Sequence, residues 1–308
     1  MPTSTRPATP ADAVAVTALM NRVDELEIGR PETDLHTVLA DLEHPDTDLE
    51  RDSWLVQDGE RLLAYGLLWD PSGGERIDVD LYALPSRRAE TELILAAMEA
   101  RALEKARVNG AARAVVHLHL NATPTLDTGL LKERGWRTVR RYHVLHRPLD
   151  AARDPLPEPP AGVRVRGCTT EADRMRVHAL HQESFAGHFD FQPRPYETWL
   201  HDLGARQLDW NLVWIVTADG LGDCGFLIAR DDREAMGWIR SIGLLPAARG
   251  RGLAGFLLRH AFGVFAARGR DTVGLGVDTR NATGAPRLYE RHGLGLHYAV
   301  DTWETVVG

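Results

Sequence analysis

Hydrophobic and polar positions follow the same order twice along the chain. The first half predicts a helix from Asp12, a hairpin over 54–69 that turns at Asp58-Gly59-Glu60, a strand over 77–84, a helix over 89–107 and a strand over 114–120. The short segment Leu130-Leu-Lys-Glu-Arg-Gly-Trp136 then has helical spacing and ends at a glycine. The pattern therefore indicates alternating helices and strands, which is typical of a layered α/β domain.

The second half repeats this order. It predicts a strand at 163–166, a helix from Thr169 or Thr170 to Phe185, a hairpin over 212–229, a strand over 238–245, a helix over 253–268, a strand over 272–277, a short helix over 285–291 and two final strands. Leu288-Tyr-Glu-Arg-His-Gly-Leu294 corresponds to the segment at 130–136. A period of about 145 residues is too long for a solenoid and indicates a duplicated domain.

A proline-rich stretch separates the halves. Ala151-Ala-Arg-Asp-Pro-Leu-Pro-Glu-Pro-Pro-Ala-Gly162 contains four prolines, which prevent helical and ladder hydrogen bonds. We therefore predict one domain over 1–150, a linker over 151–162 and a second domain over 163–308.

Composition narrows the class of protein. The 308 residues are 44% hydrophobic and 26% charged, which is ordinary for a globular protein. The formal net charge is −8 and the sequence contains no dense basic stripe, so it does not predict a nucleic-acid partner. The sequence contains no run of about 18 apolar residues, so it predicts no membrane span. Cys168 and Cys224 lack the spacing of a metal site or a disulfide framework, so we predict free thiols, no bound metal and a cytoplasmic protein. The acidic balance favours cationic substrates such as amines.

The segment with the clearest chemistry follows the strand that ends at Leu245. Pro246 stops that strand, and a loop with Gly250 and Gly252 opens the next helix. Free amides at a helix N-terminus bind anions, and glycines let a phosphate approach the backbone. Arg249 and Arg251 add positive charge. A solvated surface turn is the alternative interpretation of a Gly/Arg loop.

Arg249-Gly-Arg-Gly-Leu-Ala254 fits the R/Q-x-x-G-x-G/A motif and resembles the GNAT superfamily of N-acetyltransferases. This resemblance implies that the loop, through Arg249, Gly250, Arg251, Gly252, Leu253 and Ala254, binds the pyrophosphate of acetyl-CoA. It also implies that Ile242, Gly243, Leu244 and Leu245 receive the pantetheine and polarise the thioester carbonyl, and we expect backbone amides near Leu244 and Leu245 to stabilise the oxyanion. The fold class it implies is α/β (α+β), with two tandem domains that each contain a mixed, mostly antiparallel sheet flanked by helices.

A second match supports this resemblance. Val277-Asp-Thr-Arg-Asn281, followed by a helix in which Tyr289 precedes Gly293 by four residues, is similar to the next segment of the family. The resemblance implies that Asn281 and Arg287 contact the cofactor and that Tyr289 protonates the leaving thiolate, a role that a phenol can perform. Packing of the Tyr289 ring at a helix end is the alternative.

The tandem plan resembles the mycothiol synthase group, but only the second half carries the motifs. The corresponding loop of the first half, Pro85-Ser-Arg-Arg-Ala-Glu-Thr-Glu92, has no glycine and contains two glutamates. Leu131 stands at the tyrosine position. We predict that this copy is structural or forms a wall of the substrate pocket; a second cofactor site is the alternative.

The general base is the second departure from the group. Trp238 stands where mycothiol synthases have a glutamate, and the strand around it contains no carboxylate. Glu183, His188, Glu234 or a water molecule remain as candidates, and we select His188, which titrates in the useful range. The aromatic residues between Phe185 and Trp214 could line an acceptor pocket, but most are expected to belong to the core.

These observations predict transfer of an acetyl group from acetyl-CoA to a primary amine of a small molecule, in a monomer or homodimer. Acylation of a protein or peptide amine, use of a longer acyl-CoA, and a non-catalytic acyl-CoA sensor are the alternatives.

Overall fold

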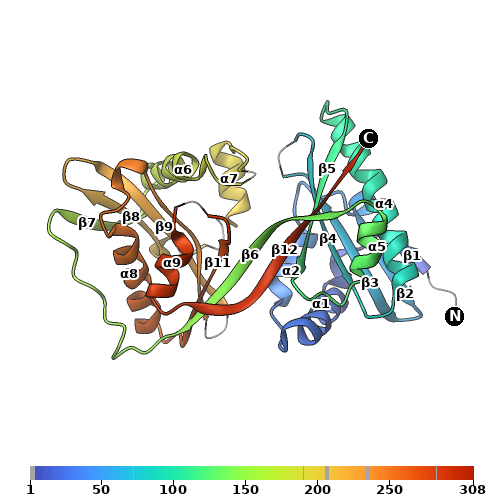
Figure 1. Ribbon diagram of the computed structural model, residues 1–308, viewed down its shortest axis with the longest axis horizontal. Helices are drawn as coiled ribbons and strands as arrows, with labels where there is room; N and C mark the ends of the chain where they lie inside the picture. The colour runs from blue at the N-terminus through green and yellow to red at the C-terminus, as the bar shows by residue number, and fades with distance from the viewer. Residues whose placement is uncertain (1–3, 72, 190, 205–207, 234–235, 282) are drawn as a thin grey trace. The chain divides into compact units, whose positions relative to one another are not determined.

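The computed structural model describes residues 4–71, 73–189, 191–204, 208–233, 236–281 and 283–308. The chain divides into two compact units. Unit 1 consists of residues 4–142 and 298–308, and unit 2 of residues 143–297. Each unit contains its own run of hydrogen-bonded strands and is described separately (Figure 1).

Unit 1 contains most of the elements of the first half. In chain order they are β1 (Ser4–Arg6), the 3₁₀ turn η1 (Pro10–Asp12), α1 (Ala13–Ile28), α2 (Leu35–Leu42), α3 (Leu49–Asp52), β2 (Ser53–Asp58), β3 (Arg61–Trp69), β4 (Arg76–Ala83), α4 (Arg88–Val108), β5 (Ala114–Asn121) and α5 (Thr128–Glu133). The strand order is β1-β2-β3-β4-β5, and only β4 and β5 pair in parallel.

Unit 2 repeats this arrangement. Its elements are β7 (Val163–Gly167), α6 (Glu171–Phe185), α7 (Tyr196–Asp202), η2 (Trp210–Leu212), β8 (Val213–Ala218), β9 (Gly222–Arg233), β10 (Met236–Leu244), η3 (Pro246–Ala248), α8 (Leu253–Ala267), β11 (Thr272–Asp278) and α9 (Ala285–Arg291). The order is β11-β10-β9-β8-β7; within the described residues of these five strands, β10 and β11 pair in parallel and the other three pairs are antiparallel. Both sheets are thus mixed and mostly antiparallel, which confirms the predicted fold class.

Two long strands pass from one unit to the other. β6 (Arg137–Pro148) begins in unit 1 and ends in unit 2, whereas β12 (Gly295–Val307) begins in unit 2 and ends in unit 1. Residues Val300–Val307 of β12 pair antiparallel with Asn121–Ala114 of β5, so the end of the chain completes the first sheet (Figure 1). The predicted pair of final strands is therefore wrong, because the described residues form one continuous strand there.

The observed division also differs from the predicted boundary at the proline-rich linker. Residues 155–160 form no helix or strand, as the prolines dictate, but they pack within unit 2. The backbone of Leu156 lies so close to Gly263 of α8 that a Cβ on that glycine would be 2.8 Å from it. An ion pair between the Arg147 guanidinium and the Asp154 carboxylate, with 2.6 Å between N and O, anchors the start of the proline-rich stretch. The separation therefore comes at Tyr142/His143 and again at His297/Tyr298, since packing and not proline content decides it.

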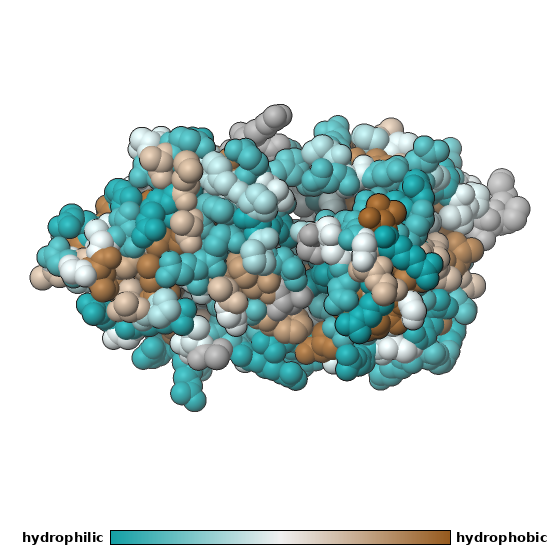
Figure 2. Space-filling model, turned by 90° about the horizontal axis from the view of Figure 1, so that it is seen from above, coloured by the Kyte–Doolittle hydropathy of each residue, from teal (hydrophilic) through white to brown (hydrophobic). Residues whose placement is uncertain are grey.

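Each sheet carries a hydrophobic core on both faces. In unit 1, α4 covers one core and α1 and α2 cover the other; in unit 2, α8 covers one core and α6 and α7 cover the other. Thr170 caps α6 as predicted, because its side chain accepts from the Asp173 amide in a capping box. On the face shown in Figure 2, hydrophilic side chains predominate and hydrophobic ones are scattered among them.

Candidate functional site

The edge of β10 opens where its partner strand leaves it. The parallel register with β11 joins Met236 to Thr272 and ends at Ile239 and Leu275, whereas the pairing with β9 continues to Leu244. Backbone groups of residues 240–244 that point away from β9 are therefore unpaired in the sheet. Such an edge can hydrogen bond to an extended ligand in the way that a further strand would.

Alternation along the strand decides which amides face this opening. The amide of Leu245 donates to the Cys224 carbonyl of β9 over 2.9 Å. Because successive N–H groups of a strand point to opposite edges, the amide of Leu244 points into the opening. The carbonyl of Leu244 accepts from Nε of Arg249 over 3.2 Å. Of the two amides expected to stabilise an oxyanion, Leu245 is thus already engaged and Leu244 is available.

Gly243 lets helix α6 approach the strand at this point. A Cβ at Gly243 would lie 2.4 Å from Oγ of Ser184 and 2.5 Å from the Phe226 ring. Any larger residue would push α6 away from β10. The absence of a side chain therefore sets the width of the site beside the open edge.

The loop between β10 and α8 exposes backbone amides. Gly250 and Gly252 have φ values of 75° and 77°, and a Cβ at either position would meet nothing within 4 Å. No side chain caps α8, whose first backbone hydrogen bond runs from Phe256 to Gly252. The amides before Phe256 are therefore free to bind an anion at the positive end of the helix dipole.

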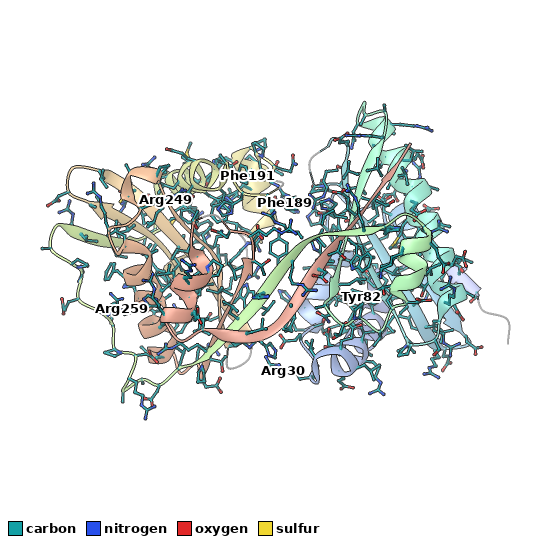
Figure 3. The ribbon with its side chains drawn as sticks, in the orientation of Figure 1. Arg30, Tyr82, Phe189, Phe191, Arg249 and Arg259 are labelled. Atoms are coloured by element: carbon teal, nitrogen blue, oxygen red, sulfur yellow. The ribbon has the colours of Figure 1, made fainter. Side chains whose placement is uncertain are left out.

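The two loop arginines differ in their contacts. Arg249 folds back and donates to the backbone carbonyls of Leu244 and Ser184, over 3.2 and 3.4 Å (Figure 3). Its guanidinium therefore ties the loop to β10 and α6. Arg251 is exposed and makes no hydrogen bond or ion pair within the described ranges, so its charge is directed to solvent.

Helix α9 is held close to the first turn of α8. Nδ1 of His292 donates to the Leu288 carbonyl over 2.8 Å, which leaves Nε2 to accept from Arg259 over 3.4 Å (Figure 3). A Cβ at Gly255 would be 2.9 Å from that Nε2, so the glycine permits the contact. This packing fixes α9, and with it Tyr289, relative to the anion loop.

Tyr289 is buried, and its hydroxyl group makes no hydrogen bond within the described residues. The residue is 6% exposed, and its hydroxyl bonds to no other residue of the described chain. Burial raises the pKa of Tyr289 to about 12. The phenol therefore stays protonated at physiological pH and can donate to a group placed beside it.

The segment after β11 is ordered by Asn281. Its Oδ1 accepts from the amide of Thr283 over 2.8 Å and from the hydroxyl group of the same residue. Since Oδ1 serves the turn, the Nδ2 group is the part of Asn281 left to donate to a ligand. Arg287, in the first turn of α9, is exposed.

His188 follows the end of helix α6, and its backbone amide donates to the Phe185 carbonyl over 2.8 Å. The ring packs 4.3 Å from Phe185, centroid to centroid. Burial lowers the pKa of His188, the positive charge of Arg249 lowers it further, and Asp278 opposes both. The imidazole is therefore largely neutral at pH 7 and can accept a proton. Glu183 is exposed, and Glu234 lies outside the described residues.

Sequence reasoning missed His181, a partly buried residue of α6 whose ring packs 4.7 Å from Phe185 and 5.5 Å from Phe226, centroid to centroid. Its Nδ1 accepts from Nε1 of Trp199 over 3.2 Å, and burial lowers its pKa to about 4. No spacing in the sequence relates a histidine on α6 to a tryptophan on α7. Trp199 and Trp214 are buried in separate cores, at 3% and 5% exposure, which confirms that they are core residues.

Trp238 fills the position where the general base was expected. It pairs with Gly274 of β11, and a Cβ on that glycine would be 2.7 Å from the indole. Its ring meets His146 edge to face, with centroids 6.4 Å apart. The described part of β10 contains no carboxylate, so a base must come from another element.

The corresponding region of unit 1 lacks these features. Helix α4 begins after Arg87, with no side-chain cap, and Ser86 takes a positive φ of 63° without being a glycine. Glu90 lies in the first turn, 3.6 Å from Arg87. Leu131 is fully buried where unit 2 has Tyr289.

Comparison with known proteins agrees with this geometry. Residues 209–293 match the model of the acetyltransferase (GNAT) domain. A mycothiol acetyltransferase from Thermobispora bispora is 30% identical over 93% of both chains, and one from Beutenbergia cavernae is 36% identical over 44% of this chain and 46% of its own. The chain belongs to the tandem-domain acetyltransferases of the GNAT superfamily.

Solved structures show the same architecture over the whole chain. A GCN5-related N-acetyltransferase from Sphaerobacter thermophilus aligns with a TM-score of 0.82 and 27% identity, covering 99% of this chain and 95% of that one. A tandem GNAT protein from the clavulanic acid biosynthesis pathway aligns with a TM-score of 0.72 and 17% identity over 100% and 99% of the two chains, a likeness of fold alone. By its family match and its relatives, the protein is a GNAT acetyltransferase. Within its described residues, no helix combines the length and apolar character that a bilayer span requires.

Proposed function

We propose that the protein transfers the acetyl group of acetyl-CoA to a primary amine of a small molecule, and that unit 2 carries out the reaction. The observation that carries the proposal is the combination of a free-amide loop at Gly250 to Gly252 with an unpaired phenol, Tyr289, on the helix packed against the same α8. The mycothiol acetyltransferase relatives act on a small molecule by their name, which favours that acceptor class over a protein.

In this proposal the cofactor lies along the open edge of β10. The loop amides and Arg251 bind the pyrophosphate, and Asn281 and Arg287 contact the cofactor from the other side. The pantetheine pairs with the backbone between residues 240 and 244, and the amide of Leu244 donates to the thioester oxygen as negative charge develops there.

The chemical step follows from this placement. The neutral amine attacks the thioester carbon, the new C–N bond forms, and collapse of the tetrahedral intermediate breaks the C–S bond. Tyr289 gives its proton to the leaving sulfur. His188, neutral at pH 7, accepts the proton that the amine releases, directly or through water.

The test combines calorimetry with acetyl-CoA and an assay of free thiol released over a panel of small amines. We expect binding with one site per chain, and thiol release with at least one amine but not in the absence of an acceptor. Binding without thiol release on any amine would favour the sensor, and release only with peptide amines would favour the peptide acyltransferase. A matched series of acyl-CoA lengths measures whether acetyl is the preferred group.

A further inference from the structure

The side chains that cover the backbone at the open edge of β10 come from α6 and β9. A Cβ at Gly243 would lie 2.4 Å from Oγ of Ser184 and 2.5 Å from the Phe226 ring, so both side chains lie directly against this glycine. The hydroxyl group of Ser184 donates to the Leu180 carbonyl over 2.7 Å. It is therefore already engaged, and a polar contact to a ligand on this side needs another residue.

His181 of α6 lies next to Phe226. The two rings meet edge to face with centroids 5.5 Å apart, and the imidazole also packs 4.7 Å from the Phe185 ring. The ring of Phe191, labelled in Figure 3, is 6.3 Å away, again edge to face. Through Phe226 the imidazole is thus one side chain away from Gly243. Because His181, Phe185 and Phe191 are each only partly buried, a ligand can reach this aromatic cluster.

The hydrogen bond to Trp199 determines which nitrogen of His181 carries the proton. Nε1 of Trp199, on α7, donates to Nδ1 of His181 over 3.2 Å. An indole N–H can only donate, so Nδ1 is unprotonated and the neutral ring carries its proton on Nε2. Burial lowers the pKa of His181 to about 4, and positive charge on other groups of unit 2 lowers it further. Those groups are Arg240, His178, His188 and Arg194.

The Nε2–H of His181 is a donor that the chain does not use. It has no acceptor among the described residues, and the nitrogen is not fully enclosed. His178, three residues earlier on α6, differs in this respect. Its ring also packs against Trp199, with centroids 5.3 Å apart, but its Nε2 donates to the Arg194 carbonyl over 2.8 Å. Since polar groups in such places are normally satisfied, the free donor of His181 is suited to a ligand oxygen.

We propose that His181 is a specificity-determining residue of the acceptor site, and that its Nε2–H donates to an uncharged oxygen of the acceptor. The inference rests on the acetyl transfer proposed for unit 2 and names its substrate class: amines that carry a hydroxyl, ether or carbonyl oxygen a few bonds from the nitrogen. A neutral imidazole N–H attracts such an oxygen but not a protonated amino group, which has only donors. The contact therefore holds the acceptor by its oxygen and leaves the nitrogen free to react.

The first measurement compares acceptors that differ only by this oxygen. Thiol release is followed with 2-methoxyethylamine against butylamine, and with 3-methoxypropylamine against pentylamine, which are pairs of equal chain length. The readout is the ratio of kcat/KM within each pair. Only the change of this ratio between variants is interpreted, because the two amines of a pair differ in basicity.

Three variants of unit 2 separate the donor from the packing. His181→Asn keeps an oxygen at the place of Nδ1 for the Trp199 indole but removes the Nε2 donor, and it should lower the ether-to-alkyl ratio about fivefold or more for at least one pair. His181→Gln places an amide nitrogen near the position of Nε2 and should restore part of the ratio. His178→Asn is the matched control, since it lies on the same helix against the same indole, and should change the ratio less than about twofold.

The second measurement does not depend on turnover. Long-range ¹H–¹⁵N correlation spectra of the full chain with labelled histidines report which nitrogen of His181 is protonated, and His181→Gln assigns its signals. We expect the Nε2–H form throughout about pH 6 to 8. Addition of 2-methoxyethylamine should shift the Nε2 signal saturably and more than butylamine does. Trp199→Phe should let the Nδ1–H form appear, because the indole donor is gone.

Three results would overturn the inference: a charged or Nδ1-protonated His181 in the natural chain, equal shifts with the two amines, or an unchanged ratio in His181→Asn. If no amine releases thiol, the proposed acetyl transfer fails, and the spectra alone decide whether His181 contacts the ether oxygen. If thiol is released but the ratio is the same in every variant, the acetyl transfer stands and the role of His181 fails. The two failures are therefore distinguishable.

Discussion

In both units the pairing of the two parallel strands ends early and leaves an open strand edge, but the residues that follow this edge differ between the units. In each, the two parallel strands pair over four residues, Arg76–Val79 with β5 in unit 1 and Met236–Ile239 with β11 in unit 2, and then pairing ends. Unit 2 follows its opening with two positive-φ glycines, bare amides and an unpaired phenol. Unit 1 follows its own with Glu90 and a buried leucine, and concentrates polar groups on the opposite face of β4.

The difference shows which features a duplicated fold supplies and which the side chains supply. Strand pairing alone creates the edge. Whether that edge can hold an anionic cofactor depends on a few positions at the start of the following helix. Glycines there leave the backbone amides open to an anion, whereas a glutamate adds a negative charge that repels one. The largest test of the comparison is therefore to make unit 2 resemble unit 1 at this loop.

Gly252→Glu should abolish measurable acetyl-CoA binding, with an affinity loss of at least about 100-fold, because it adds a negative charge and a strained φ at the anion site. Gly269→Glu is the matched control: Gly269 has the same φ of 77° and equally open surroundings, but it lies beyond the far end of α8. Calorimetry measures both. Equal losses in the two variants would assign the effect to backbone strain, not to the loop's role.

Tyr289→Phe should lower kcat about 10²-fold while acetyl-CoA affinity changes little, since only the proton donor is removed. Single-turnover thiol release measures the chemical step. Tyr142→Phe, which removes a tyrosine hydroxyl group from β6, is the control and should leave kcat unchanged. Full turnover in Tyr289→Phe would show that another group protonates the sulfur.

The pH dependence of kcat should identify the base. Because the pKa of His188 is lowered, the ascending limb should lie below pH 6.5, and no descending limb from Tyr289 should occur below about pH 11. His188→Gln should remove the ascending limb and lower the plateau about 10-fold. An unchanged limb would exclude His188 as the base.

The smallest expected effect is on stability in unit 1. Burial raises the pKa of Asp41, on α2, to about 7. A carboxyl group whose folded-state pKa is raised binds more protons when folded, so Asp41 is least destabilising below its unfolded pKa of about 4 and most destabilising above pH 7. Asp41→Asn should therefore increase the free energy of unfolding by on the order of 1–2 kcal/mol at pH 8 and change it little at pH 4. Urea unfolding at both pH values measures this. A loss of stability at pH 8 would mean that Asp41 has a favourable partner.

Most elements and the anion loop could be predicted from the sequence because their signals are local. Alternation in β4, the cap at Thr170 and the glycines at 250 and 252 each act within a few residues. The same holds for Tyr289, whose spacing to Gly293 lies within one helix. The availability of its hydroxyl, in contrast, depends on the packing of α9 against α8.

The incorrect predictions concern features that depend on contacts between residues far apart in the sequence. The path of β12 into the first sheet pairs residues that are 179 (Val300 with Asn121) to 193 (Val307 with Ala114) positions apart, and no local pattern distinguishes that strand from one that stays in its own half. The proline-rich stretch was taken as a boundary because proline prevents hydrogen bonds, but a glycine on α8 lets it pack. The pairing between β9 and β10 also decides which of the two amides expected near the oxyanion is open, because the amide of Leu245 donates to the Cys224 carbonyl.

The sequence by itself determined that two α/β copies exist, that a loop with two glycines and two arginines precedes the long helix of the second, and that the described part of β10 has no carboxylate. These follow from residue identity and short spacing. Only the tertiary structure decided where the units divide and that Arg249 ties the loop to neighbouring carbonyls. Such features depend on burial and on contacts between distant segments, which shift charge and hydrogen bonding only once the chain has folded.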